Sequence, residues 1–177
     1  MAKTETHDPL PAPKAEGKTL LIVRAPYYKS IAEDQLAGAI AAIEAAGARH
    51  DLIDVPGALE IGTAIAMAAR ADKYDGFVAL GCVIRGETTH YETVCEESAR
   101  AITMLGLSGL CIGNGILTVE NRKQAEDRAD PRDQNKGGGA AEAALHLIAF
   151  RETLEPKRKI GFGFAPDSEH ILIAGGD

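Results

Sequence analysis

Tryptophan is absent from this chain of 177 residues, which also has only four tyrosines and four phenylalanines. Cysteine is as scarce. Cys82, Cys95 and Cys111 are odd in number and too widely spaced for a zinc knuckle, so we expect reduced core thiols in a cytoplasmic protein. No apolar run approaches the roughly 20 residues of a membrane span, and the first residues lack the apolar centre of a signal peptide. We therefore expect neither a membrane partner nor export.

Positive charge is also in deficit, because the formal net charge is −7. An acidic chain is a poor non-specific ligand for nucleic acid, although it can still hold a local basic site. The motifs G-x-x-x-x-G-K-[ST], G-x-S-x-G and H-E-x-x-H are missing, and no G-x-G-x-x-G follows the first predicted strand. Their absence argues against a P-loop protein, a serine hydrolase, a metalloprotease and a dinucleotide-binding protein.

What remains is an alternation of apolar strand patterns and amphipathic helix patterns. The predicted strands are 19–24, 51–55, 76–84 and 109–117, and the predicted helices are 30–46, 58–70, 89–106, 121–130 and 139–155. This order predicts a three-layer α/β/α domain with a flavodoxin-like, four-stranded parallel sheet. We expect the domain to span 19–155, between a loose N-terminal arm (1–18) and a C-terminal tail (156–177). In the last helix, Ala143, Leu147 and Phe150 are predicted to face inward.

The most informative stretch is 81–95, which reads GCVIRGETTHYETVC. An apolar strand ends at Arg85 and Gly86, and a helix pattern begins near Thr89. Thr89 with Glu92 fits a capping box, as Ser30 with Glu33 does for the first helix. The stretch is therefore predicted to be a strand, a glycine turn and a helix start at the carboxyl edge of the sheet. Ligands bind at that edge, and the unpaired N–H groups of a helix start favour an anion.

Each polar residue of this turn has a functional and an ordinary interpretation. His90 could be a general acid or base beside an anion, or a solvated residue of the first helical turn. The turn could hold a phosphate, or merely cap the helix. Arg85 could be only a solvated charge at the rim.

Other candidate positions lie elsewhere in the chain. Tyr27 and Tyr28 follow the first strand, where an aromatic ring could stack on a planar ligand or simply pack. Glu60 lies in the first turn of the second helix and could bind hydroxyl groups, or only favour the helix dipole. Arg128 and Lys136 flank the last loop and could reach an anion, although short charged helices are usually solvated faces.

Taken with further motifs, the stretch 81–95 resembles the signature of the lumazine synthase family of riboflavin biosynthesis. The similar segments, which come in the family's order, are 56–61 (PGALEI), 115–121 (GILTVEN), Gln124, Ala125 and Arg128, and 135–137 (NKG). The resemblance implies a four-stranded parallel sheet with flanking helices, assembled as pentamers. It also implies that 5-amino-6-ribitylamino-uracil condenses with 3,4-dihydroxy-2-butanone 4-phosphate to give 6,7-dimethyl-8-ribityllumazine, phosphate and water. No metal or organic cofactor is implied.

The resemblance assigns the phosphate half of the site. His90 would transfer protons, Arg128 of the neighbouring subunit would neutralise the phosphate, and Lys136 would add charge at the rim. The residues implied to hold the phosphate at the helix start are Gly86, Glu87, Thr88 and Thr89.

The other half of the implied site takes the ribityl-pyrimidine. Tyr27 would stack on the ring, and Glu60 would accept hydrogen bonds from ribityl hydroxyls. Val83 and Ile84 would border the pyrimidine, and Ala58 and Leu59 would line the ribityl site beside Glu60.

Some positions depart from the family pattern. Asn114 stands where many members have an aromatic residue that faces the neighbour's ligand, so we expect altered affinity for substrate or flavins rather than lost catalysis. The turn 25–29 reads APYYK, with Tyr27 and Tyr28 where the family often shows an Arg-Phe or Arg-Trp pair. A rival hypothesis is a shell or flavin-binding paralogue with little turnover. The segment 129–138 has no insertion, which favours an icosahedral shell of pentamers, and riboflavin synthase is a candidate partner.

Overall fold

The computed structural model describes residues 10, 11 and 13–154 of the chain. The predicted tail and most of the predicted arm lie outside the described residues. The elements are β1 (Thr19–Arg24), α1 (Lys29–Ala45), β2 (Arg49–Asp54), α2 (Ala58–Ala69), β3 (Gly76–Ile84), α3 (His90–Leu107), β4 (Ile112–Val119), α4 (Arg122–Ala129) and α5 (Lys136–Leu154). The predicted order of strands and helices is confirmed.

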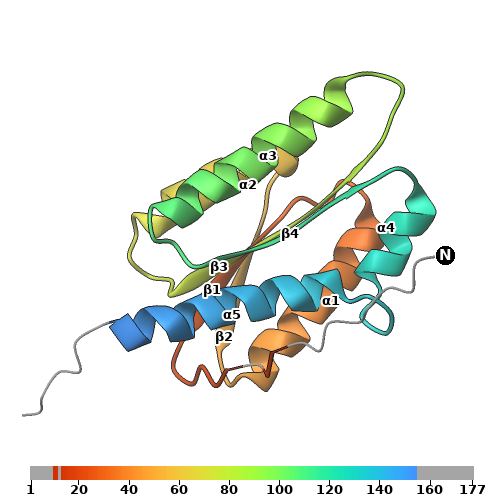
Figure 1. Ribbon diagram of the computed structural model, residues 1–177. Coiled ribbons are helices and arrows are strands. Elements are labelled where there is room, and N and C mark those ends of the chain that lie inside the picture. Colours follow the sequence, from red (N-terminus) through yellow and green to blue (C-terminus); the bar gives the residue numbers. More distant parts are fainter. Residues whose placement is uncertain (1–9, 12, 155–177) are drawn as a thin grey trace, which may run out of the picture.

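The four strands form one parallel sheet in the order β2-β1-β3-β4. Helices α2 and α3 cover one face of this sheet, and α1, α4 and α5 cover the other (Figure 1). The chain moves outward from β1 to β2 and then returns to the other side of β1 with β3, so the topological switch point lies between β1 and β3. The flavodoxin-like three-layer fold predicted from the sequence is confirmed.

Burial on both faces explains the unbroken apolar runs of the central strands. In β1, Leu20 and Ile22 pack into the core beneath α1 and α5, whereas Leu21 and Val23 pack beneath α2 and α3. Side chains alternate between the two faces of a strand, so a strand covered on both sides needs apolar residues at every position.

Helix α5 approaches both α1 and β4 so closely that each contact requires a glycine. A Cβ on Gly137 would lie 2.1 Å from the backbone oxygen of Gln35, and a Cβ on Gly113 in β4 would lie 1.7 Å from the backbone oxygen of Ala140. Backbone cannot yield to such contacts as a flexible side chain can. These glycines therefore fix where α5 begins, and with it the position of Lys136.

The predicted inner face of the last helix is wrong. Leu145 and Ile148 are buried, whereas Leu147 and Phe150 are 43% and 60% exposed. The apolar side chains of α5 itself are distributed around nearly its whole circumference, so their spacing in the sequence does not select one buried face. The close contact of Gly137 with the backbone of Gln35 in α1 selects it instead.

Several predicted helix and strand starts also shift. Tyr28 occupies the N-cap of α1 and no side chain caps it, so the Ser30–Glu33 capping box is wrong. Strand β4 starts at Ile112 rather than 109. Helix α5 starts at Lys136 because the Asn135 side chain accepts a hydrogen bond from the Gly138 N–H at 3.1 Å. In the part of the chain that the structure describes, no helix has the length and apolar character needed to cross a membrane.

Candidate active site

Three loops meet at the carboxyl edge of the sheet, and backbone hydrogen bonds hold their first residues in place. The N–H of Ala25 donates to the carbonyl of Leu80 at 2.9 Å, and the N–H of Arg85 donates to the carbonyl of Val119 at 2.9 Å. The N–H of Val55 donates to the carbonyl of Arg24 at 2.8 Å. The backbone hydrogen bonds between neighbouring strands thus continue past the strand ends, so the loops leave the sheet from rigid positions.

These loops surround a cavity of about 450 Å³. That volume suits a small organic molecule. Its lining comprises Ala25, Tyr27, Tyr28, Pro56, Gly57, Ala58, Leu59, Glu60, Cys82, Val83, Ile84, Gly86, Thr88, His90, Tyr91 and Val94. The cavity lies where parallel α/β sheets bind ligands. It brings together ten of the positions singled out from the sequence, namely Tyr27, Tyr28, Ala58, Leu59, Glu60, Val83, Ile84, Gly86, Thr88 and His90.

The turn between β3 and α3 is open rather than tightly capped. Thr89 is the N-cap of α3, but its side chain makes no capping hydrogen bond. Thr88 Oγ1 accepts a long hydrogen bond from the His90 N–H at 3.4 Å. The predicted Thr89–Glu92 capping box is therefore wrong. The start of α3 points its partial positive charge toward the cavity.

Gly86 has a different reason to be glycine from the glycines under α5. A Cβ built on it would meet no atom within 4 Å, and its φ does not lie in the left-handed region. Neither the backbone conformation nor the packing of the chain requires glycine at this position. The open space above Gly86 belongs to the cavity.

Glu92 bonds to Arg85 instead of reaching back to the cap. Arg85 Nη1 donates to a Glu92 carboxylate oxygen, and Arg85 Nε donates to Glu120 Oε2 at 2.6 Å. The hydrogen bond from Arg85 lowers the pKa of Glu92 below its ordinary value. The guanidinium also lies 4.2 Å from the ring centroid of Tyr91. Arg85 is thus a paired and stacked group, not a free rim charge.

The two tyrosines after β1 have separate roles in the packing. Tyr28 is half-buried and packs against the cluster that contains Ile31 and Leu117. Tyr27 is 75% exposed, and its ring meets that of Tyr28 edge-on with centroids 5.0 Å apart. Tyr27 therefore presents an open aromatic face at the mouth of the cavity, and Tyr28 supports it from the side.

Glu60 and Cys82 line the same cavity with very different chemistry. The carboxylate of Glu60 lies in the first turn of α2, so near Gly57 that a Cβ there would be 3.0 Å from Oε2. Cys82 is half-buried, and burial raises the pKa of its thiol to about 11. At neutral pH it is a neutral wall group rather than a nucleophile.

Five predicted residues do not line this cavity: Glu87, Thr89, Asn114, Arg128 and Lys136. Glu87 and Thr89 are exposed beside it. Asn114 lies on the edge strand β4, where its side chain accepts a hydrogen bond from the Ile116 N–H at 3.0 Å. Arg128 lies on α4, and Lys136 is the first residue of α5.

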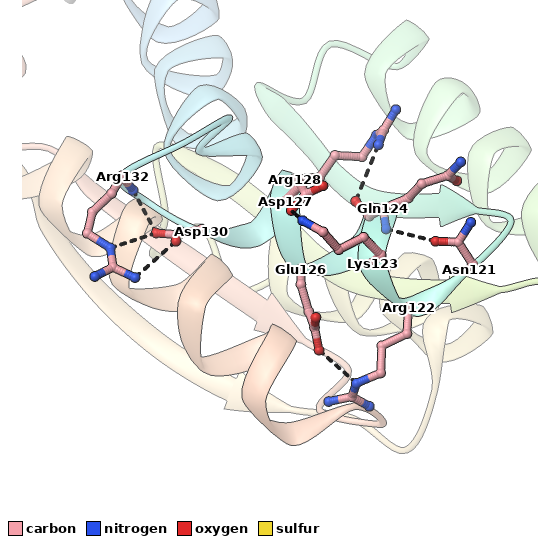
Figure 2. A network of polar contacts seen from close by, with 9 residues as sticks. All are labelled: Asn121, Arg122, Lys123, Gln124, Glu126, Asp127, Arg128, Asp130 and Arg132. Carbon is pink, nitrogen blue, oxygen red and sulfur yellow. Dashed lines mark hydrogen bonds and ion pairs between the residues drawn. The ribbon is translucent and has the colours of Figure 1, made fainter.

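Arg128 differs from the cations around it (Figure 2). Arg122 pairs with Glu126, Lys123 with Asp127 and Arg132 with Asp130. The Arg128 guanidinium donates to the backbone oxygen of Gln124 at 3.3 Å and has no carboxylate partner among residues 13–154. Its charge remains available to an anion.

Sequence reasoning missed several lining residues. Val94 lies four residues after His90 and three after Tyr91, the spacings that place helical residues on one face. That spacing could have identified them. Pro56 and Gly57 immediately precede residues that were identified, but nothing in their side chains marks them as pocket residues.

The fold and the cavity define an α/β protein with a cavity of small-molecule size at the switch point of a parallel sheet. Comparison with known proteins makes this specific. The family model for 6,7-dimethyl-8-ribityllumazine synthase matches residues 17–152. The chain belongs to this family, a group of transferases in riboflavin biosynthesis that form lumazine.

Individual relatives support the assignment over most of the chain. A 6,7-dimethyl-8-ribityllumazine synthase of Jannaschia sp. is 61% identical over 142 residues, which is 80% of each protein. One from Novosphingobium aromaticivorans is 56% identical over 132 residues, or 75% of this chain and 95% of the relative. One from Zymomonas mobilis is 54% identical over 134 residues, or 76% of this chain and 96% of the relative.

Proposed function

We propose that the protein condenses 5-amino-6-ribitylamino-uracil with 3,4-dihydroxy-2-butanone 4-phosphate, the penultimate step of riboflavin biosynthesis. The 5-amino group attacks the ketone, water and inorganic phosphate leave, and the second ring closes to give 6,7-dimethyl-8-ribityllumazine. Two reactants must be held together while protons move, so positioning and general acid–base catalysis are the main requirements. The family membership supports this choice of substrates.

The observation that carries the proposal is that the imidazole of His90 and the N-terminal end of α3 lie at the same cavity. His90 begins α3, and Gly86 and Thr88 of the preceding turn line the same cavity. A phosphate at this helix start would receive N–H hydrogen bonds from the backbone and Oγ hydrogen bonds from Thr88, with Glu87 and Thr89 contributing backbone groups. His90 would then lie beside the leaving group and could carry protons to and from the condensing atoms.

The second reactant fits the remaining walls of the cavity. Tyr27 would stack on the planar pyrimidine, and the backbone of Val83 and Ile84 would border its edge. Glu60, beside Ala58 and Leu59, would accept hydrogen bonds from the ribityl hydroxyls. This places the amino group of one substrate within the same cavity as the phosphate of the other.

We also infer that the site is shared between subunits of a pentamer. Arg128 has no carboxylate partner in the described chain and does not line its own cavity, which is expected of a cation that serves a neighbour's phosphate. Lys136 and Asn114 would likewise approach a neighbouring site. A pentamer would also cover Met67, Met104 and Leu107, which are 67%, 63% and 84% exposed.

A higher assembly and its setting complete the proposal. The short connection between α4 and α5 leaves room for pentamers to pack into an icosahedral shell, with riboflavin synthase as a partner to test. Three unpaired cysteines favour a reducing compartment, so we propose the cytoplasm. Sedimentation velocity and electron microscopy should show closed shells, and finding only pentamers would contradict this part of the proposal.

The catalytic proposal is tested by mixing both substrates with the protein and following the fluorescent lumazine. We expect formation well above the spontaneous background, with one phosphate released per lumazine formed. The rival interpretation, a paralogue that binds flavin without turnover, is favoured by Asn114 at the edge strand. A rate no greater than that of heat-denatured protein, together with tight riboflavin binding, would support the paralogue.

A further inference from the structure

We propose that Arg85 is a positioning residue that holds the turn 86–89 in its phosphate-binding shape through two carboxylates, and does not itself contact the phosphate. The inference rests on the proposed function, because it concerns how the phosphate half of that site is built. We refer to Arg85, Glu92 and Glu120 together as the Arg85 bracket.

The Arg85 bracket joins both ends of the turn to the neighbouring strand. Arg85 is the last residue before the turn, and Glu92 lies in the first helical turn after it. Arg85 donates to both carboxylates, through Nε to Glu120 Oε2 at 2.6 Å and through Nη1 to Glu92. Glu120 follows β4, whose last residue also receives the Arg85 N–H at 2.9 Å. One side chain thus fixes the start of the turn, its end and the adjacent strand relative to one another.

The guanidinium has little capacity left for a phosphate. Two carboxylates oppose its single positive charge, so the bracket as a whole carries a net negative charge. One face of the guanidinium lies over the ring of Tyr91, with 4.2 Å to the centroid. Tyr91 lines the cavity, so the bracket also fixes one of its walls. A phosphate would have to displace a carboxylate to reach Arg85.

The bracket continues into the helix that carries Arg128. The backbone N–H of Glu120 donates to Gln124 Oε1 at 2.9 Å, and the backbone oxygen of Gln124 accepts from Arg128 Nη1 at 3.3 Å. The turn is therefore connected, through short polar contacts, to the cation proposed to serve the neighbouring subunit. Loosening Arg85 would disturb the phosphate site in its own subunit first.

The direction in which Glu120→Gln changes phosphate binding distinguishes a positioning role of Arg85 from direct binding of the phosphate. If Arg85 bound phosphate, Glu120→Gln would release it from a competing carboxylate and would tighten phosphate binding. Removal of a nearby negative charge acts in the same direction. If the bracket positions the turn, Glu120→Gln breaks it and weakens binding. We expect Glu120→Gln and Arg85→Gln each to raise the KM for the butanone phosphate about five- to tenfold, which lies within the range of coupling between contacting groups in one network.

Further variants sharpen the comparison. Arg85→Lys keeps the charge but cannot bridge two carboxylates and stack, so its KM should resemble that of Arg85→Gln. The double variant Arg85→Gln with Glu120→Gln should be no worse than either single variant. The KM for the pyrimidine and kcat should change less than about twofold. Arg100→Gln, which breaks a surface pair with Glu97 on α3, is the matched control and should change nothing.

Amide hydrogen exchange supplies a readout that needs no turnover. Peptides covering 86–90 should exchange faster in Arg85→Gln and Glu120→Gln than in wild type. Their exchange rate should be unchanged in Arg100→Gln. A lowered or unchanged KM in Glu120→Gln, or unchanged exchange in both bracket variants, would overturn the proposal. If wild-type protein forms no lumazine, the proposed function fails, and exchange together with binding of inorganic phosphate still decides whether Arg85 holds the turn.

Discussion

The position of Arg128 leads to a prediction that tests both its role and the shared site. In Arg128→Ala, the guanidinium is removed from α4 while the ion pairs of Arg122 and Lys123 on the same helix remain. Within the described chain, the substitution removes one hydrogen bond of the guanidinium, which it donates to the Gln124 carbonyl at 3.3 Å. That carbonyl already lies in a helix, so the fold should tolerate the change.

The magnitude follows from the lack of a competing carboxylate. A hydrogen bond to a charged group contributes about 1.5–3 kcal/mol, and each 1.4 kcal/mol is a factor of ten. Because nothing in the described chain neutralises Arg128, we expect most of this range to appear as weaker phosphate binding. The KM for the butanone phosphate should rise about 10- to 100-fold, while the KM for the pyrimidine should change less than about threefold.

The assay follows lumazine fluorescence while one substrate is varied at saturating concentration of the other. Lys123→Ala is the matched control, because Lys123 lies on the same helix but is paired with Asp127. It should leave both KM values unchanged. Equal effects of Arg128→Ala on the two KM values would contradict the phosphate role.

Mixed assemblies show which subunit supplies the guanidinium. Arg128→Ala and His90→Ala subunits are refolded together at equal concentrations. If Arg128 serves the neighbouring site, about one quarter of the sites contain both native residues, and at butanone phosphate concentrations well below the KM of Arg128→Ala the activity exceeds that of either variant alone. If Arg128 serves its own site, every site lacks one of the two residues and no activity is regained. The second result would refute the shared site.

Four further predictions concern catalysis, the thiol and stability. His90→Ala should lower kcat about 100-fold or less, because the cavity still holds both reactants together, and an unchanged kcat would remove His90 from the mechanism. Cys82 should react with iodoacetamide only slowly at pH 7, and the rate should rise toward its thiol pKa of about 11; fast labelling at neutral pH would contradict its burial. The hydrogen bond from Arg24 lowers the pKa of Asp54, so their pair stabilises the fold above the ordinary value of 3.8 and is lost as the pH falls through the lowered pKa. Asp54→Asn should therefore lower Tm at pH 7 and match wild type in strong acid, and a Tm difference that persists in strong acid would contradict the pairing. Leu145→Ala should cost about 2–5 kcal/mol in chemical unfolding, because Leu145 is fully buried on the inner face of α5, and a cost under about 1 kcal/mol would contradict the assigned inner face.

The sequence was most informative where local pattern and tertiary position agree. The run 76–84 is apolar at every position because both faces of β3 are covered, and its bounds were predicted to the residue. The helix after it was placed within one residue, since Val94, Ser98 and Ile102 form its buried face. Local periodicity and strand length were sufficient there.

Prediction failed where tertiary and side-chain contacts, rather than local spacing, decide the outcome. Glu92 lies at the right spacing for a capping box, but Arg85 competes for its carboxylate. The inner face of α5 depends on backbone contacts at Gly137, which spacing does not reveal. Arg128 and Lys136 do not line the cavity of their own chain, so their role at an anion site, with Arg128 acting from a neighbouring subunit, stays a prediction.

The two kinds of glycine in this molecule have different consequences under mutation. Gly137 has backbone 2.1 Å from where its Cβ would be, whereas Gly86 has no atom within 4 Å. In a library scored by folded yield, alanine should be rejected at Gly137 and accepted at Gly86. In a library scored by the growth of a riboflavin-dependent strain, alanine should be rejected at both positions. The difference between the two scores would map the space that the chain leaves unfilled for its ligand.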